Sequence, residues 1–141
     1  MFKPILTALS LALTLTATSA SANEFEMPVT ADFYESDIRF TGEFGVVYRF
    51  RWYVVPSGDR LAICGIGHFR DGGFMSTVRD MARDATFFVN DQPYPVDLSF
   101  FTRVRHQAEL QTGTATCRVT PAPVAGARSV GIEYGRGTYR N

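Results

Sequence analysis

Arginine is the side chain in this sequence best suited to bind a ligand, because its guanidinium holds planar carboxylates and phosphates through paired hydrogen bonds. Alternation over 44–55 predicts a strand whose buried face carries Phe50 and Trp52. The other face then carries Arg49, Arg51 and Tyr53. With Arg118, expected to point outward from a later strand, they predict an anion-binding surface. The alternative is a solvated face on which each arginine pairs with an acidic neighbour.

His68 is the candidate for acid–base chemistry. It ends a predicted strand and is followed by Asp71 on a glycine-containing loop, where a histidine can exchange protons near neutral pH. The alternative is a hydrogen-bonded histidine at a strand end near the core. A copper site of His68, His106 and a methionine is a weaker alternative, because no His-x-His pair or methionine cluster fixes its geometry.

The sequence carries none of the motifs of common hydrolases. Its two histidines lie 38 positions apart, so they cannot form the histidine pair of a zinc-protease helix. No serine after residue 22 lies in a G-x-S-x-G frame. Gly65-Ile66-Gly67 lacks the third glycine and the helix of a dinucleotide loop, and within a strand it predicts a bulge or a close backbone approach. We therefore predict no cofactor and no metal ion.

Cys64 and Cys117 are the only cysteines of the sequence and predict one disulfide. Its long closed loop corresponds to a stabilisation of roughly 4 kcal/mol. Two buried free thiols or a redox pair are the alternatives, although no C-x-x-C spacing is present to lower a thiol pKa. The runs 61–65 and 115–119 resemble disulfide-bearing core strands of small bacterial exported proteins of unknown role, and no named family follows from them.

Residues 1–22 have the pattern of a signal peptide. Lys3 precedes an apolar stretch over 5–16, and Ala20-Ser21-Ala22 matches the small-x-small rule for cleavage after Ala22. The alternative, an uncleaved anchor, needs ~20 apolar residues to span a bilayer. We expect an exported protein, periplasmic or extracellular, with residues 23–141 as a single domain and no membrane span after cleavage.

The remaining elements must position these candidates. A turn at 56–59 joins 44–55 to a return strand at 60–69, which predicts a long hairpin. Val78, Met81, Ala82 and Ala85 have helical spacing and predict one short helix. Further strands are predicted at 86–89, 96–104, 114–120 and 129–134, with weaker ones at 25–29 and 37–41, a turn at 90–93 and a polar loop at 106–113.

Seven or eight short strands predict a mainly β fold, either an antiparallel sandwich or a small barrel. The hallmarks of an immunoglobulin domain are not in order, because Trp52 precedes Cys64 and position 115 is alanine rather than tyrosine. The helix, or a partner chain, is expected to cover a sheet face where paired aromatics occur.

The balance of positive and negative residues excludes one class of function. After residue 22 there are 13 arginines and no lysine against 14 acidic residues, and this near balance argues against nucleic-acid binding. We expect a non-enzymatic binding module of the bacterial envelope whose partner is an envelope protein, a peptide or an anionic polymer. The alternative is a small exported enzyme or inhibitor with a site around His68 and Asp71. The oligomeric state stays open.

Overall fold

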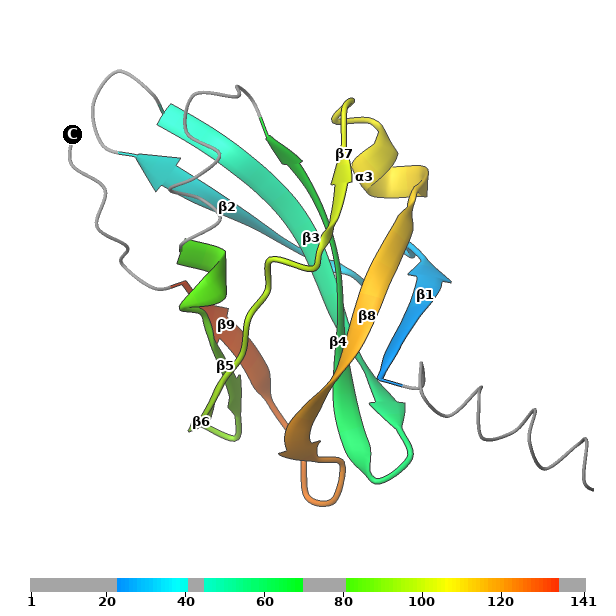
Figure 1. The fold of residues 1–141 in the computed structure, drawn as a ribbon, viewed down its shortest axis with the longest axis vertical. Coiled ribbons are helices and arrows are strands. Elements are labelled where there is room, and N and C mark those ends of the chain that lie inside the picture. Colours follow the sequence, from blue (N-terminus) through cyan, green and yellow to red (C-terminus); the bar gives the residue numbers. More distant parts are fainter. Residues whose placement is uncertain (1–22, 41–44, 70–80, 135–141) are drawn as a thin grey trace, which may run out of the picture.

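The computed structural model describes residues 23–40, 45–69 and 81–134, without the side chains of 38–40, 45–47 and 69. The predicted signal peptide, residues 1–22, lies outside the described residues. The strands form two sheets in a sandwich-like, mainly β fold, as predicted (Figure 1). The larger sheet has the order β1 (Glu24–Pro28), β8 (Thr114–Pro123), β4 (Arg60–Phe69), β3 (Gly45–Ser57) and β2 (Tyr34–Phe40), and β7 (Thr102–Val104) pairs with β4. The smaller sheet has the order β6 (Gln92–Pro95), β5 (Thr86–Val89) and β9 (Val130–Glu133).

Strands β3 and β4 form the long hairpin that the alternation predicts. Their register runs from Tyr48 opposite Phe69 to Ser57 opposite Arg60. Gly58 begins the turn with a φ of 64°, a conformation that glycine adopts without a steric cost. The hairpin forms the centre of the larger sheet, so its two faces divide the molecule into two packed layers.

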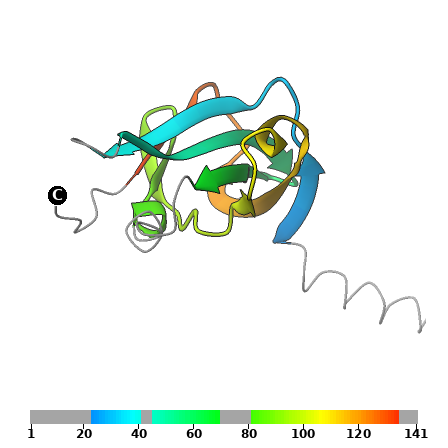
Figure 2. The same ribbon diagram turned by 90° about the horizontal axis from the view of Figure 1, so that it is seen from above.

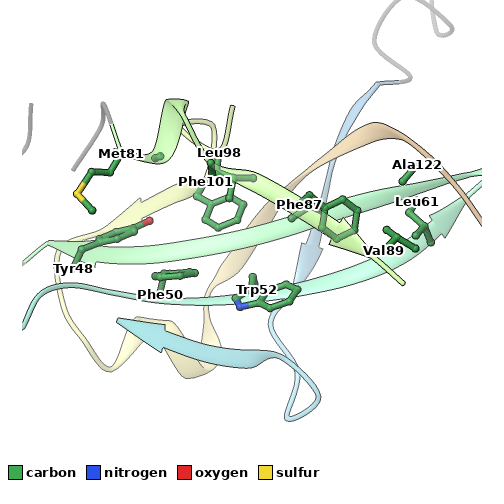
Figure 3. Packing of buried hydrophobic residues seen from close by; sticks show 13 residues of the cluster. Tyr48, Phe50, Trp52, Leu61, Met81, Phe87, Val89, Leu98, Phe101 and Ala122 are labelled. Carbon is green, nitrogen blue, oxygen red and sulfur yellow. The ribbon is translucent and has the colours of Figure 1, made fainter. Parts of the chain in front are cut away.

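The first layer lies between the two sheets. Figure 3 shows rings and aliphatic side chains of the larger sheet facing residues of β5 and of the segment around 81–101. The largest of these side chains are Tyr48, Phe50, Trp52, Phe87 and Phe101. Trp52 is 6% exposed and shares its face with Phe50, which confirms the predicted buried face of the hairpin.

The glycines of the Gly65-Ile66-Gly67 run let aromatic rings pack directly on β4. A Cβ on Gly65 would collide with the ring of Phe101, and a Cβ on Gly67 would collide with the ring of Tyr48. The prediction of a close approach is confirmed, with side-chain rings rather than backbone as the neighbours.

The predicted helix is partly within the described residues. Residues 81–83 are helical, and Met81, Ala82 and Ala85 are buried against the aromatic layer, as their spacing predicts. Val78 lies outside the described residues.

The second layer covers the opposite face of the larger sheet. It contains Phe33 from the β1–β2 connection, Ile66 of β4 and Leu110 of the short helix α3 (Glu109–Thr112). Figure 2 shows α3 beside the connection that carries the chain from β1 to β2. Because β1 and β2 are the two ends of this sheet, the connection has to pass from one edge to the other.

The predicted disulfide is confirmed and lies in this second layer. Cys64 of β4 and Cys117 of β8 are directly opposite in the antiparallel register, with Cα atoms 3.9 Å apart and both side chains fully buried. The bond fastens the centre of the sheet to β8, and it fits a non-reducing environment.

Two predictions between the sheets are wrong. The segment 96–104 was expected to be one strand, but only β7 pairs, because the N–H groups of Val96 and Leu98 donate to the carbonyls of Ala85 and Ala82 instead. The turn expected at 90–93 is shorter than predicted, because its last two residues, Gln92 and Pro93, belong to β6. The turn itself contains only Asn90 and Asp91, with φ values of 52° and 65°, which is typical of a two-residue type I′ hairpin.

The polar loop predicted at 106–113 contains α3. Its polar residues remain on the outside, while Leu110 is buried on Ile66 and the disulfide. One apolar residue on a single helical turn is too short a pattern for sequence periodicity to detect.

Candidate functional site

Arg51 is buried, so its predicted exposure is wrong. It does lie opposite Phe50 and Trp52, but the second layer covers that face and leaves its side chain 6% exposed. Its Nη1 donates to the carbonyl of Leu110 at 3.2 Å and to Oε1 of Gln111 at 3.1 Å. Its Nη2 donates to the carbonyls of Thr30 at 3.0 Å and Phe33 at 3.1 Å. Arg51 thus ties β3 to α3 and to the β1–β2 connection.

Arg49 follows the alternative in which an arginine pairs with acidic neighbours. Its Nε donates to Oδ1 of Asp37 at 3.0 Å and lies 3.8 Å from Oε1 of Glu35, both on β2. Tyr53, on the same face, is only partly exposed, and its ring stacks on Phe33 with centroids 5.4 Å apart. These residues therefore act within the sheet and its second layer.

Arg118 lies on the other face of the sheet, so the four predicted binding residues do not form one surface. On β8 it pairs with Ile63 of β4, whose side chain belongs to the aromatic layer. Its guanidinium carbon lies 4.5 Å from the centroid of the Phe100 ring. Its Nη2 donates to Oε2 of Glu24 on β1 at 3.1 Å, and the two side chains are 43% and 52% exposed. Arg118 borders a cavity.

The cavity lies between β8 and the segment 96–100, and its volume is about 100 Å³. Its lining is mostly apolar: Ile63, Val96, Leu98, Phe100, Val119 and Pro121. Asp97, Arg118 and Thr120 supply its polar groups. The Thr120 hydroxyl donates to the carbonyl of Leu61 at 2.8 Å and accepts from the N–H of Ala122 at 3.2 Å, so it holds the bulged end of β8 in place.

Asp97 supplies a negative charge at the mouth of the cavity. Partial burial favours its neutral form, but hydrogen bonds from the hydroxyl and N–H of Ser99, and then the charges of Arg118 and Arg83, outweigh this and lower the pKa of Asp97 below its ordinary value. The N–H bond from Ser99 is 2.9 Å long. The cavity thus combines a mostly apolar lining with an ionised carboxylate and a guanidinium.

His68 makes a hydrogen bond of the kind expected for a strand-end histidine near the core, which was the alternative to an acid–base role. Its Nδ1 lies 3.2 Å from the carbonyl oxygen of Val104 on β7. A carbonyl only accepts, so Nδ1 carries a proton in this contact. Asp71, the other half of this predicted site, lies outside the described residues. His106 is exposed on the loop before α3.

Family models, curated proteins and solved structures were compared with the chain. None matches it. Among the described residues, no group of three or more histidine, cysteine or acidic side chains is arranged to hold a metal ion. None of the helices in that part of the chain has the length and apolar character needed to cross a membrane.

Sequence reasoning missed Asp97 and Phe100 as parts of the candidate site. Both lie in a segment expected to be a strand, where they would have pointed to opposite faces. The signal that could have identified a loop is Asp97-Leu98-Ser99, because an aspartate followed two positions later by serine is typical of a turn in which the side chain accepts the backbone N–H.

Proposed function

We propose that this chain is a non-enzymatic binding module of the bacterial envelope, and that it holds one small apolar side chain of a peptide or protein partner in the cavity beside Arg118. The cavity is the observation that carries the proposal. The disulfide and the signal-peptide pattern support an exported setting, where such partners are displayed.

The size of the cavity supports a single side chain as the occupant. Pockets for drug-sized molecules and cofactors have volumes of roughly 300–1,000 Å³, well above the 100 Å³ found here. A dry apolar cavity of about 150 Å³ accommodates benzene, so 100 Å³ suits an aliphatic group of a few carbons. Burying such a group is favourable by about 0.8 kcal/mol for each CH₂, which gives a weak contact that neighbouring polar interactions must reinforce.

The groups around the cavity support binding rather than reaction. The hydroxyl of Thr120 is already engaged with Leu61 and Ala122. The bonds from Ser99 help to keep Asp97 ionised, and Arg118 supplies the guanidinium on the lining. A fixed pair of opposite charges beside an apolar floor orients a ligand without exchanging protons with it.

A peptide series tests the proposal with the oxidised chain 23–141. Short peptides that differ only at the last residue, which is Ala, Val, Leu or Trp, are titrated by fluorescence anisotropy. We expect the aliphatic peptides to bind at least about tenfold more tightly than the Trp peptide, because the indole does not fit 100 Å³. The substitution Val96→Phe fills the cavity and should abolish this preference.

Val124→Phe is the matched control. Val124 is also a half-buried valine packed against the aromatic layer, but it does not line the cavity. It should bind like the wild type, provided that both variants melt cooperatively and keep the disulfide. Equal binding of all four peptides, or no binding of any, would overturn the proposed function.

A further inference from the structure

We infer that the cavity recognises the carboxyl terminus of a peptide: the last side chain, small and aliphatic, enters the cavity, and Arg118 holds the free carboxylate. This inference rests on the proposed function and names its ligand class. It follows from the position of one guanidinium relative to the apolar lining and from the carboxylate that already contacts it.

The guanidinium of Arg118 is oriented but not saturated. Its guanidinium carbon lies over the Phe100 ring, 4.5 Å from the centroid, and this cation–π contact restrains the guanidinium beside the cavity. Among residues 23–40, 45–69 and 81–134, Arg118 has one hydrogen-bond acceptor, Glu24, which binds Nη2, although an arginine carries five N–H donors in a planar fork. An oriented fork with unused donors is the usual receptor for a carboxylate.

The contact with Glu24 shows that this guanidinium can bind a carboxylate beside the cavity. The 3.1 Å contact joins two side chains that are each about half exposed, and exposed pairs of this kind contribute little to stability. The Glu24 side chain can therefore turn into solvent when a ligand carboxylate arrives. Glu24 acts as an internal competitor rather than as a permanent partner.

The geometry of the ligand follows from the place of Arg118 in the lining. Because Arg118 itself lines the cavity, the negative charge of the ligand must lie within one residue of the buried apolar group. A carboxyl-terminal residue meets this condition, since its carboxylate and its side chain are attached to the same Cα. An internal residue offers Arg118 only a neutral amide. Asp97 also lines the cavity, and its ionised carboxylate disfavours a second negative charge on the ligand.

A matched pair of peptides tests this inference. One peptide ends in valine with a free carboxylate, and the other is identical but ends in valine amide. We expect the acid to bind at least about tenfold more tightly than the amide, because only the acid forms charge-assisted hydrogen bonds to Arg118. Raising the salt concentration should reduce this ratio, because the pair is exposed at the rim.

Three variants and one control show which residues cause the preference for the acid. Arg118→Ala should bring the ratio of acid to amide binding close to one, and Arg118→Lys should lower it only in part, since lysine keeps the charge but lacks the planar fork. Glu24→Gln should bind the acid several-fold more tightly than the wild type, because the competitor is gone. Arg128→Ala removes an equal charge from an exposed loop and should change neither affinity.

The outcomes separate this inference from the function it rests on. If the wild type binds acid and amide equally but still prefers aliphatic peptides, recognition of the terminal carboxylate is overturned. The proposal that the cavity holds an apolar side chain then still stands. A ratio that survives Arg118→Ala, or an acid affinity that falls in Glu24→Gln, would overturn the role of Arg118. Absence of binding by either peptide would contradict the proposed function itself.

Discussion

Arg51 and Arg118 lie on opposite faces of one sheet and differ in what covers them. Arg51 lies under α3 and the β1–β2 connection, where four acceptors take up its donors. Arg118 lies at a rim, stacked on one ring and bonded to one exposed carboxylate. Alternation along a strand determines the face of a residue, whereas chain segments distant in sequence determine whether that face is buried. A buried, saturated arginine stabilises the fold, and an oriented, partly bonded one remains available for a ligand.

The largest expected effect comes from removing the buried member of this pair. Arg51→Ala removes the guanidinium donors from the carbonyls of Phe33 and Leu110, whose bonds to Arg51 are buried. We expect a loss of about 3–5 kcal/mol in the free energy of unfolding, because each stranded buried acceptor costs on the order of 1–3 kcal/mol. Urea denaturation of the oxidised protein measures it.

Arg118→Ala is the control for that measurement. The same truncation at an exposed, singly paired arginine should cost less than about 1 kcal/mol. Equal losses for the two variants would mean that the difference in burial does not decide their roles.

The strongest sequence patterns predicted the fold well. The hairpin β3–β4, the buried Trp52 and the Cys64–Cys117 bond follow from period two over a long run and from a single possible cysteine pairing. These features depend on residues within one element, or on a covalent partner with no competitor. Strand β6 and helix α3 were missed, because two of the four residues of β6 are prolines and α3 buries a single apolar residue, Leu110.

The candidate site was only partly predictable, since it depends on tertiary contacts. Arg118 was identified as an outward cation, but Phe100 and Asp97 reach it only because the segment 96–100 leaves the sheet. That departure depends on backbone hydrogen bonds from Val96 and Leu98 to the turn around residues 82–85. The burial of Arg51 likewise needs the β1–β2 connection, whose path no local pattern specifies.

An intermediate effect is expected from the aromatic layer, which lies on the same face of the larger sheet as Arg118. Gly65→Ala places a methyl group against the ring of Phe101, and the ring must move within a packed layer. We expect a loss of about 1–3 kcal/mol in the free energy of unfolding, as for other overpacked cores. The displaced ring also stacks edge-on with Phe100, at 5.2 Å between centroids, so the cavity beside Arg118 should change shape and peptide binding should weaken.

Gly131→Ala is the matched control for this substitution. Gly131 is also a strand glycine, but a Cβ there meets no atom within 4 Å and its φ is not positive. The change should be neutral or stabilising by about 0.4–1 kcal/mol. A destabilisation by Gly131→Ala as large as that by Gly65→Ala would show that strand glycines matter here for backbone reasons rather than for ring packing.

The smallest expected effect concerns Asp97, the acidic neighbour of Arg118. Its folded-state pKa is lowered, so its ionised form stabilises the fold above the unfolded pKa of about 3.9, and this contribution is lost as the pH falls through the lower folded pKa. Asp97→Asn removes the contribution at every pH. The stability difference between wild type and variant should therefore be constant above about pH 5 and shrink as the solution becomes more acidic. It should stay below about 1 kcal/mol, because the carboxylate is exposed and water screens its partners. Denaturant midpoints from pH 3 to pH 7 test this, and a difference that does not change with pH would show that the charge of Asp97 adds nothing to the folded cavity.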